Sequence, residues 1–179
     1  MDGDNFSIEL CDDINRIPPE DWNTIAGTEN PFVCHSFLAA LEAGKAVGGD
    51  TGWEPLHLIM RDDSGKLIGA MPHYLKNHSY GEFIFDHSWA DGFMRAGGQY
   101  YPKMLSAVPF TPVTGPRLMT GKATGTRRHQ IIRGLVNGMI HYVDKLQLSS
   151  AHINFLPMED AETLVDEGWL IRHSIQFHW

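Results

Sequence analysis

The sequence predicts an α/β fold in which a mixed, largely antiparallel sheet is flanked by helices. Two patterns support this. Several segments alternate apolar and polar residues, as half-buried strands do, and the segment from Thr126 to Leu146 repeats apolar residues at helical spacing. The chain has 179 residues, enough for one domain with a substantial core, so residues 1–179 are expected to form a single domain.

The N-terminal part reads as one strand followed by two helices. Phe6 to Cys11 alternates apolar and polar positions and predicts the first strand. Prolines and acidic residues just before Trp22 are typical of a helix start, and Gly27 is expected to end that helix. A second helix is predicted from Ser36 to Ala43, with Gly44 as its stop.

Three extended segments are predicted next: Glu54 to Met60, Leu67 to Lys76, and Glu82 to Asp86. The run Asp62 to Gly65 is a tight-turn sequence, so the first two segments should pair antiparallel. Pro72 lacks an N–H group and should interrupt the second segment at a bulge or an edge.

The remaining chain is expected to alternate helix and strand. Ser88 to Lys103 reads as an irregular helix and loop, and the helix from Thr126 to Leu146 should pack on the sheet. A strand at Ala151 to Phe155 and a helix from Glu159 to Glu167 follow. The run Trp169 to Trp179 has a strand pattern up to its last residue. We therefore expect it to pair with another strand, either from a continuation of the same chain or from another subunit.

Composition narrows the function classes. A net charge of −8 disfavours a broad surface for nucleic acid or anionic lipid. No apolar run is long enough to span a bilayer, and the acidic N-terminus lacks a secretory signal, so we predict a cytoplasmic location. Cys11 and Cys34 are expected to be free thiols, and the ten histidines lack metal-binding spacing. We therefore predict no metal site, and expect His57 and His152 to be core or edge histidines with one hydrogen-bond partner.

The segment Val108 to Arg117 contains three prolines and one glycine, which predicts a stiff loop. Such a loop, between a strand and the clearest helix, would line the main pocket and hold Thr111, Thr114 and Arg117 against a substrate. The alternative is a structural connector in which the prolines only suppress disorder.

The run from Phe85 to Asp91 contains two acids and a histidine among aromatic residues. Asp86, His87 and Asp91 are candidates for proton removal in catalysis, because an imidazole titrates near neutral pH. The alternative is that Asp86 and His87 only cap the following helix. Nearby aromatic side chains could hold a sugar or a peptide; the candidates are Trp89, Tyr100 and Tyr101.

The start of the helix at Thr126 carries Arg127 and Arg128, cations at the positive end of the helix dipole. A bound anion would remove this conflict, although two solvated arginines are an equally good explanation. Gly121 and Gly125 leave backbone N–H groups unencumbered for a cofactor phosphate.

Several long motifs resemble an uncharacterised bacterial family labelled peptidoglycan biosynthesis/recognition, one of the FemAB-like members of the GNAT acyltransferase superfamily. The motifs run from Asn30 to Phe32, Thr51 to His57, Phe85 to Asp91, Gly97 to Lys103, Val108 to Arg117 and Gln176 to Trp179. The resemblance covers nearly the whole chain. It implies a GNAT-like fold and a second, similar domain in full-length members, so that residues 1–179 would form the first half.

The resemblance also implies transfer of an acyl or aminoacyl group to an amine of a cell-envelope precursor or another small molecule. The donor would be acyl-CoA or aminoacyl-tRNA, with no tightly bound cofactor. The GNAT acyl-CoA signature is not matched in register, because Arg117, Gly121 and Ala123 span one residue too many and Lys122 with Gly125 is followed by Arg127. Two alternatives remain: a binding module that recognises a peptidoglycan-like sugar or peptide, and a scaffold half-domain.

Overall fold

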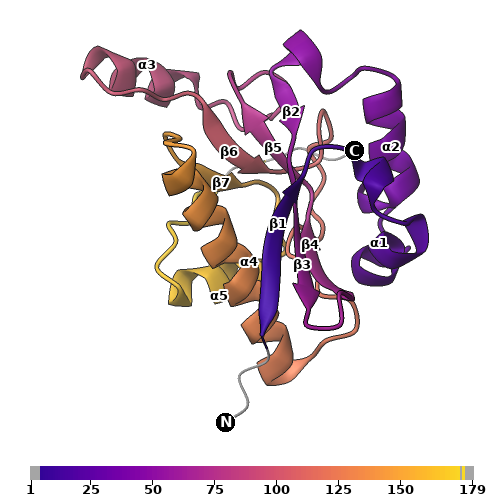
Figure 1. Cartoon of the computed structure of the whole chain (residues 1–179). Coiled ribbons are helices and arrows are strands. Elements are labelled where there is room, and N and C mark those ends of the chain that lie inside the picture. Colours follow the sequence, from indigo (N-terminus) through magenta and orange to yellow (C-terminus); the bar gives the residue numbers. More distant parts are fainter. Residues whose placement is uncertain (1–4, 174, 176–179) are drawn as a thin grey trace.

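The computed structural model describes residues 5–173 and 175, and within this part of the chain the strands form two sheets (Figure 1). One sheet has the order β1-β3-β4 and the other the order β2-β5-β6-β7. The strands are β1 Phe6–Cys11, β2 Trp53–Pro55, β3 His57–Asp62, β4 Leu67–Met71, β5 His73–Lys76, β6 Lys103–Ser106 and β7 Ala151–Ile153. All pairs are antiparallel except β6 with β7, which confirms the mixed, largely antiparallel sheet.

The two sheets are joined by strands that continue from one into the other. Pro72 separates β4 from β5, and Leu56 separates β2 from β3. The Leu56 N–H donates to the carbonyl of His73 at 2.9 Å, which carries the ladder across the break. The break at Pro72 is confirmed, but the chain changes sheets there instead of forming a bulge; the irregular register lies between Met60 and Arg61.

Helices α1 (Pro19–Ala26) and α2 (His35–Ala43) cover one face of β3 and β4 (Figure 1). Glu20 and Asp21 lie in the first turn of α1, where they complement the helix dipole. Trp22 is fully buried, and its indole N–H donates to the Val33 carbonyl at 2.8 Å. Three short 3-10 helices connect these elements, at Ile14–Arg16, Pro31–Val33 and Gly49–Thr51.

Helices α4 (Gly125–Lys145) and α5 (Met158–Asp166) lie on the opposite face (Figure 1). The apolar side chains of α4 join one core cluster with the strand residues Leu58, Met60, Met71 and Met104; they are Ile131, Ile132, Leu135, Val136 and Met139. Each such buried side chain contributes about 1.5–3 kcal/mol relative to exposure. The helix predicted from Thr126 to Leu146 is therefore confirmed and packs on the sheet as expected.

Helix α3 (His87–Arg95) projects away from the sheets beside β6 (Figure 1). Ala90 is the helix's buried residue, whereas Trp89, Phe93 and Met94 are exposed. The expected helix and loop after Ser88 are confirmed, except that Lys103 already belongs to β6.

The strand expected from Glu82 to Asp86 is wrong. Glu82 and Asp86 are buried and Phe83 and Phe85 are exposed, so burial alternates as it does in a strand. However, Phe83 and Phe85 have φ angles of 58° and 49°, in the left-handed region, and no ladder forms. The alternation comes from two carboxylates turned toward one buried cation.

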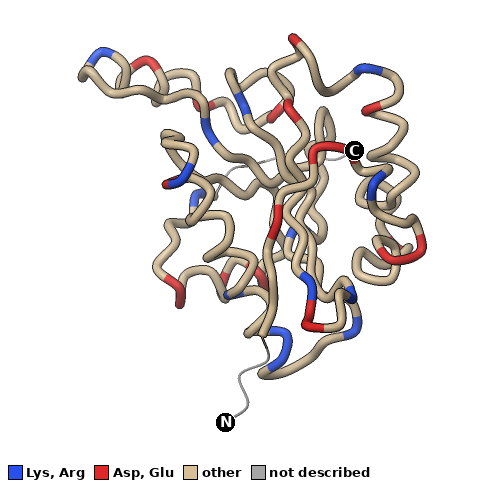
Figure 2. Tube along the Cα trace, in the orientation of Figure 1, with Lys and Arg blue, Asp and Glu red and all other residues tan. Residues whose placement is uncertain are grey.

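In the C-terminal run predicted as a strand, residues 169–173 and 175 are not in a strand, and Leu170 is 98% exposed. The rest of that prediction lies outside the described residues. Among the described residues, no helix is long and apolar enough to cross a membrane. Lys and Arg are dispersed along the described chain instead of covering one face (Figure 2).

Candidate functional site

The parallel strands β6 and β7 end beside the predicted binding loop. The chain leaves β6 into residues 107–124, and the Gly115 N–H donates to the carbonyl of Phe155, just after β7, at 3.0 Å. Further along, Met119 and Ala70 exchange backbone hydrogen bonds of 3.0 Å, which fastens the loop to β4. Ligands of α/β folds gather outside the carboxyl ends of parallel strands. The loop therefore lies where a ligand is expected.

Arg117 is a buried cation on this loop, with 1% of its surface exposed. Its Nη2 donates to the Val113 carbonyl at 2.8 Å and its Nη1 to the Pro116 carbonyl at 3.2 Å. Nε is buried without a hydrogen-bond partner, and no carboxylate of the described residues forms an ion pair with this guanidinium. Burial lowers the pKa of Arg117 to about 10, against the opposing influence of Tyr74, so it stays charged at neutral pH.

Asn30 and Arg117 approach the same point of the loop. A Cβ atom placed on Gly115 would stand 2.2 Å from Asn30 Nδ2 and 3.4 Å from Arg117 Nη1. The Asn30 Oδ1 accepts the Phe32 N–H at 3.0 Å, which turns the amide nitrogen toward Gly115. Any side chain at 115 would collide with Asn30, so this glycine is what allows the two donors to converge.

The other loop residues differ in position. Thr111 is half-buried and its hydroxyl donates to the Pro109 carbonyl at 3.0 Å, whereas Thr114 is exposed. Arg117 was expected to contact a substrate; the structure buries it, and its role as a contact stays a prediction. The guanidinium donates to the carbonyls of Val113 and Pro116, which hold it in the interior. The loop lines neither the hollow beside Arg127 nor the hollow beside Trp89.

A second buried cation, Lys103, has a full set of partners. Its Nζ lies 2.9 Å from Asp86 Oδ2, 3.0 Å from Glu82 Oε2 and 3.1 Å from Ser79 Oγ. Tyr100 donates its hydroxyl to Asp86 Oδ2 at 2.8 Å. This ionic cluster (Ser79, Glu82, Asp86, Tyr100 and Lys103) anchors the segment before α3 to the start of β6.

The cluster shifts the pKa values of its carboxylates in opposite directions. Although burial opposes it, hydrogen bonds from Ser79, Lys103 and Tyr100 lower the pKa of Asp86 to about 2. Burial raises the pKa of Glu82, against the opposing influence of Lys103. Burial also lowers the pKa of the neighbouring Lys76 to about 7, and its Nζ lies 3.7 Å from the centre of the Trp53 ring.

The structure does not bring the three predicted catalytic residues together. Asp86 points into the ionic cluster, whereas His87 and Asp91 are exposed on α3. A carboxylate with a pKa of about 2 takes up no proton near neutral pH, so the arrangement argues against Asp86 as a general base. His87 and Asp91 are one helical turn apart and share a solvent-facing side, and their catalytic role stays a prediction.

The predicted aromatic binding residues also separate. Tyr100 and Tyr101 pack edge to face with ring centres 5.1 Å apart, and Tyr101 shares a 2.7 Å hydrogen bond with Ser79. They therefore support the ionic cluster. Trp89 is 68% exposed and lines an open hollow of about 460 Å³ with Ser88, Gly92 and Phe93.

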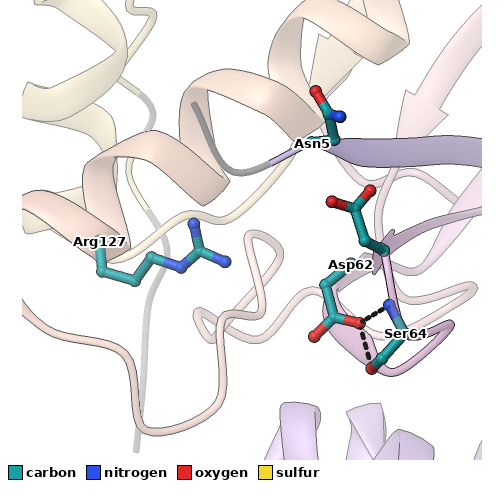
Figure 3. Close-up of a pocket in the computed structure, with 5 residues that line it drawn as sticks. Asn5, Asp62, Ser64 and Arg127 are labelled. Carbon is teal, nitrogen blue, oxygen red and sulfur yellow. Dashed lines mark hydrogen bonds between the residues drawn. The ribbon is translucent and has the colours of Figure 1, made fainter. Parts of the chain in front are cut away.

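The start of α4 does not present two unopposed arginines. Arg128 forms ion pairs with Asp160 and Glu159 in the first turn of α5. Arg127 points across a shallow hollow of about 270 Å³ toward the turn that contains Asp62 and Ser64 (Figure 3). The two acids of α5 compensate Arg128, and the anion site predicted at this helix start stays a prediction. Gly121 and Gly125 have φ angles of 59° and 52°, and the Gly121 N–H already donates to the Ile25 carbonyl at 3.1 Å. The cofactor role of this junction stays a prediction.

The histidines behave as expected for core residues. His57 is fully buried, with Nε2 2.9 Å from Glu42 Oε1, and His152 Nε2 lies 2.8 Å from the Ser150 hydroxyl. Burial lowers the pKa of His152 to about 4. Among the described residues, no three His, Cys, Asp or Glu side chains are grouped so that they could hold a metal ion.

Sequence reasoning missed Asn30, Glu82 and Lys103 as members of polar clusters. Asn30 entered the sequence analysis only as the first residue of a motif, and Lys103 only as the end of a loop and of a motif. The one available signal was that both lie within the long motifs quoted above. Their partners are distant in sequence, so no local pattern could pair them.

Comparison with known proteins gives two positive findings. Residues 13–179 match the model of a FemAB-like family described as peptidoglycan biosynthesis/recognition. An aminoglycoside N-acetyltransferase, AAC(6')-Iy in complex with CoA, superposes with a TM-score of 0.56 at 12% sequence identity, over 99% of this chain and 95% of that one. No curated protein matches the chain. At that identity the structural likeness shows the fold, whereas the family match extends over most of the sequence, and the chain therefore belongs to the FemAB-like family and has the GNAT acetyltransferase fold.

Proposed function

We propose that this protein is an acyl- or aminoacyl-transferase of the GNAT type that acts on an amine of a cell-envelope precursor or of another small molecule. The observation that carries the proposal is the position of the loop at 108–117. It lies at the carboxyl ends of a parallel strand pair and holds a buried cation, in a chain of this family and fold. A GNAT fold with such a loop supports binding and positioning of a small substrate.

The donor in this proposal is acyl-CoA or aminoacyl-tRNA, bound as a substrate and not held tightly between turnovers. The structural neighbour contains CoA, which favours acyl-CoA. The junction between residues 117 and 125 lacks the usual acyl-CoA signature, and the Gly121 N–H already donates to the Ile25 carbonyl at 3.1 Å. The exposed Gly125 at the start of α4 is therefore the proposed phosphate contact. A cytoplasmic location is part of this proposal.

Amide formation needs few specialised groups. The amine nitrogen attacks the carbonyl carbon, the C–S bond of a thioester or the C–O bond of an ester breaks, and the ammonium proton leaves to a base. His87 is the proposed base. Its ring lies 6.0 Å from the ring of Tyr80, and Gly81, the residue after Tyr80, accepts the N–H of Phe110 on the loop at 3.2 Å.

We also propose that residues 1–179 are the first of two GNAT-like halves. The exposed aromatic side chains of α3 and the 98% exposed Leu170 offer apolar surface for a second half or another subunit. The chain alone should then turn over slowly, and addition of the second half should raise the rate. Equal rates for the isolated chain and the two-domain protein would contradict this arrangement.

The test is product formation followed by mass spectrometry, with acyl-CoAs and aminoacyl-tRNAs as donors and envelope precursors as acceptors. A transferase gives a donor-dependent amide product, and His87→Ala lowers its rate by about 10²–10⁴-fold. Exposed His141→Ala, on α4, is the matched control and should leave the rate unchanged. Absence of product with both donor classes, in the chain alone and with its second half, would overturn the proposal.

One observation favours a second candidate function, a binding module for a peptidoglycan-like sugar or peptide. Trp89 and Phe93 are exposed side by side on α3 and line the hollow of about 460 Å³. Aromatic faces of this kind hold sugar rings and peptides. A binder would show ligand-induced stabilisation that Trp89→Ala removes, with no amide product.

A further inference from the structure

The guanidinium of Arg117 lacks a counter-charge. A buried ionised group is strongly unfavourable unless it is paired and hydrogen-bonded. Only 1% of Arg117 is exposed, and its partners in the described structure are two backbone carbonyls, those of Val113 and Pro116. The protein therefore retains a buried positive charge that nothing described neutralises.

The unused donors of Arg117 lie next to another unused donor. A guanidinium has five N–H groups, and the two carbonyls leave the Nε–H and one N–H on each terminal nitrogen. The Asn30 amide nitrogen and Arg117 Nη1 both lie within 3.4 Å of the point where a Cβ on Gly115 would stand. Asn30 is only partly buried, so this cluster of donors borders solvent on the Asn30 side.

The arrangement matches a carboxylate better than a phosphate. A carboxylate carries one negative charge and accepts two parallel N–H donors from a guanidinium. Here a single cation and one neutral amide converge: the atoms nearest to the Cβ position of Gly115 belong to Asn30 and Arg117. A phosphate dianion would leave one charge unpaired in this buried place.

We propose that Arg117, Asn30 and Gly115 form a binding site for the carboxylate of a small molecule that also carries an amine, such as an amino acid or a short peptide. This inference rests on the proposed transfer reaction and identifies the acyl acceptor. The carboxylate of the acceptor binds Arg117 and Asn30, and the amine of the acceptor faces the exposed side of the loop. Gly115 contributes by leaving room for the Asn30 amide.

The test is a titration of the whole chain followed by NMR of the arginine Nε–H groups, with acetate, alanine and inorganic phosphate as probes at constant ionic strength. Acetate and alanine should move the Arg117 resonance saturably, and phosphate should not. Arg61 and Arg133 are internal controls, because their Nε–H groups already donate to Glu9 and Glu167. No movement with acetate, or an equal response to phosphate, would overturn the carboxylate site; a response to acetate but not to alanine would overturn the acceptor assignment.

Asn30→Asp keeps the oxygen that accepts the Phe32 N–H and replaces the amide nitrogen by a carboxylate oxygen. This internal carboxylate should occupy Arg117 and weaken acetate binding by at least about tenfold. Asn23→Asp is the matched control: Asn23 is also half-buried and its Oδ1 accepts a backbone N–H, that of His35, at 3.0 Å. Equal acetate affinity in the two variants would count against the site.

The titration contains no acyl donor, so it is independent of turnover. Product formation with an unresponsive Arg117 would remove this inference and leave the transferase. A saturable Arg117 response without any product would leave the carboxylate site and remove the acceptor role.

Discussion

Lys103 and Arg117 are both buried cations, but their surroundings differ. Lys103 is fully buried and contacts two carboxylates and a serine hydroxyl, with Tyr100 closing the network. Arg117 is equally buried and contacts only backbone carbonyls among the described residues. The charge of Lys103 is compensated inside the fold, whereas that of Arg117 is not.

The difference separates a structural role from a binding role. A compensated ion cluster fixes two segments relative to each other, here the segment before α3 and the start of β6. An uncompensated buried cation is expected where a ligand supplies the missing charge. Removal of the Lys103 cation should therefore lower the free energy of unfolding, whereas a carboxylate supplied beside Arg117 should raise it.

The largest effect is expected from Lys103→Met. It leaves Glu82 and Asp86 buried without their cation, and removing one partner of a buried pair destabilises a protein by about 3–5 kcal/mol. Urea unfolding at pH 7 measures this loss. Lys122→Met, an exposed control, should change the free energy of unfolding by less than about 0.5 kcal/mol. A loss below about 1 kcal/mol for Lys103→Met would show that the cluster is not structural.

Acid should weaken the same cluster through Asp86. Its pKa is about 2 in the folded protein and near 3.8 when unfolded, so its contribution is complete above about pH 4 and is lost as the pH falls toward 2. The loss amounts to about 2 kcal/mol. Glu82, whose pKa is raised, acts with the opposite sign. In Asp86→Asn, the free energy of unfolding should depend less on pH between pH 5 and pH 2 than in the parent chain. An equal dependence in both proteins would contradict the ion pair.

A smaller effect of opposite sign is expected at Arg117. Asn30→Asp supplies a carboxylate beside the uncompensated guanidinium and should raise the free energy of unfolding by about 1 kcal/mol at pH 7. The gain should be complete above about pH 4 and should be lost as the pH falls further and the new carboxylate becomes protonated. Asn23→Asp should show no such gain. Destabilisation of Asn30→Asp at pH 7 would mean that Arg117 needs no further partner.

The smallest effect is expected from Trp89→Ala. The side chain is 68% exposed on α3, away from both cations, so its removal should change the free energy of unfolding by less than about 0.5 kcal/mol. Thermal unfolding measures this change. A loss above about 2 kcal/mol would show that α3 is packed and does not offer a free surface.

Local patterns predicted much of the fold. The strand Phe6–Cys11, the helix ending at Gly27 and the long helix after Thr126 were readable because each has its own periodicity and end signals. The segment from Glu82 to Asp86 shows the limit of this reading. Its alternation comes from carboxylates turned toward Lys103, a contact that no window of sequence contains.

The candidate site was harder to predict. The loop at 108–117 was located from its prolines, and Arg117 was singled out, but its burial was not foreseen because that depends on which carbonyls the prolines leave unpaired. Asn30 meets Gly115 only in the folded chain. The grouping of Asp86 with His87 failed because adjacent residues at a helix start point in different directions.

The most direct measurement is the acetate dependence of stability in the parent chain and in Asn30→Asp, at constant ionic strength. A ligand that binds only the folded state at ten times its dissociation constant adds about 1.4 kcal/mol to the free energy of unfolding. We predict this increase in the parent and none in Asn30→Asp, where Arg117 already has its carboxylate. An equal increase in both proteins, or no increase in the parent, would contradict the account of Arg117 as the uncompensated cation.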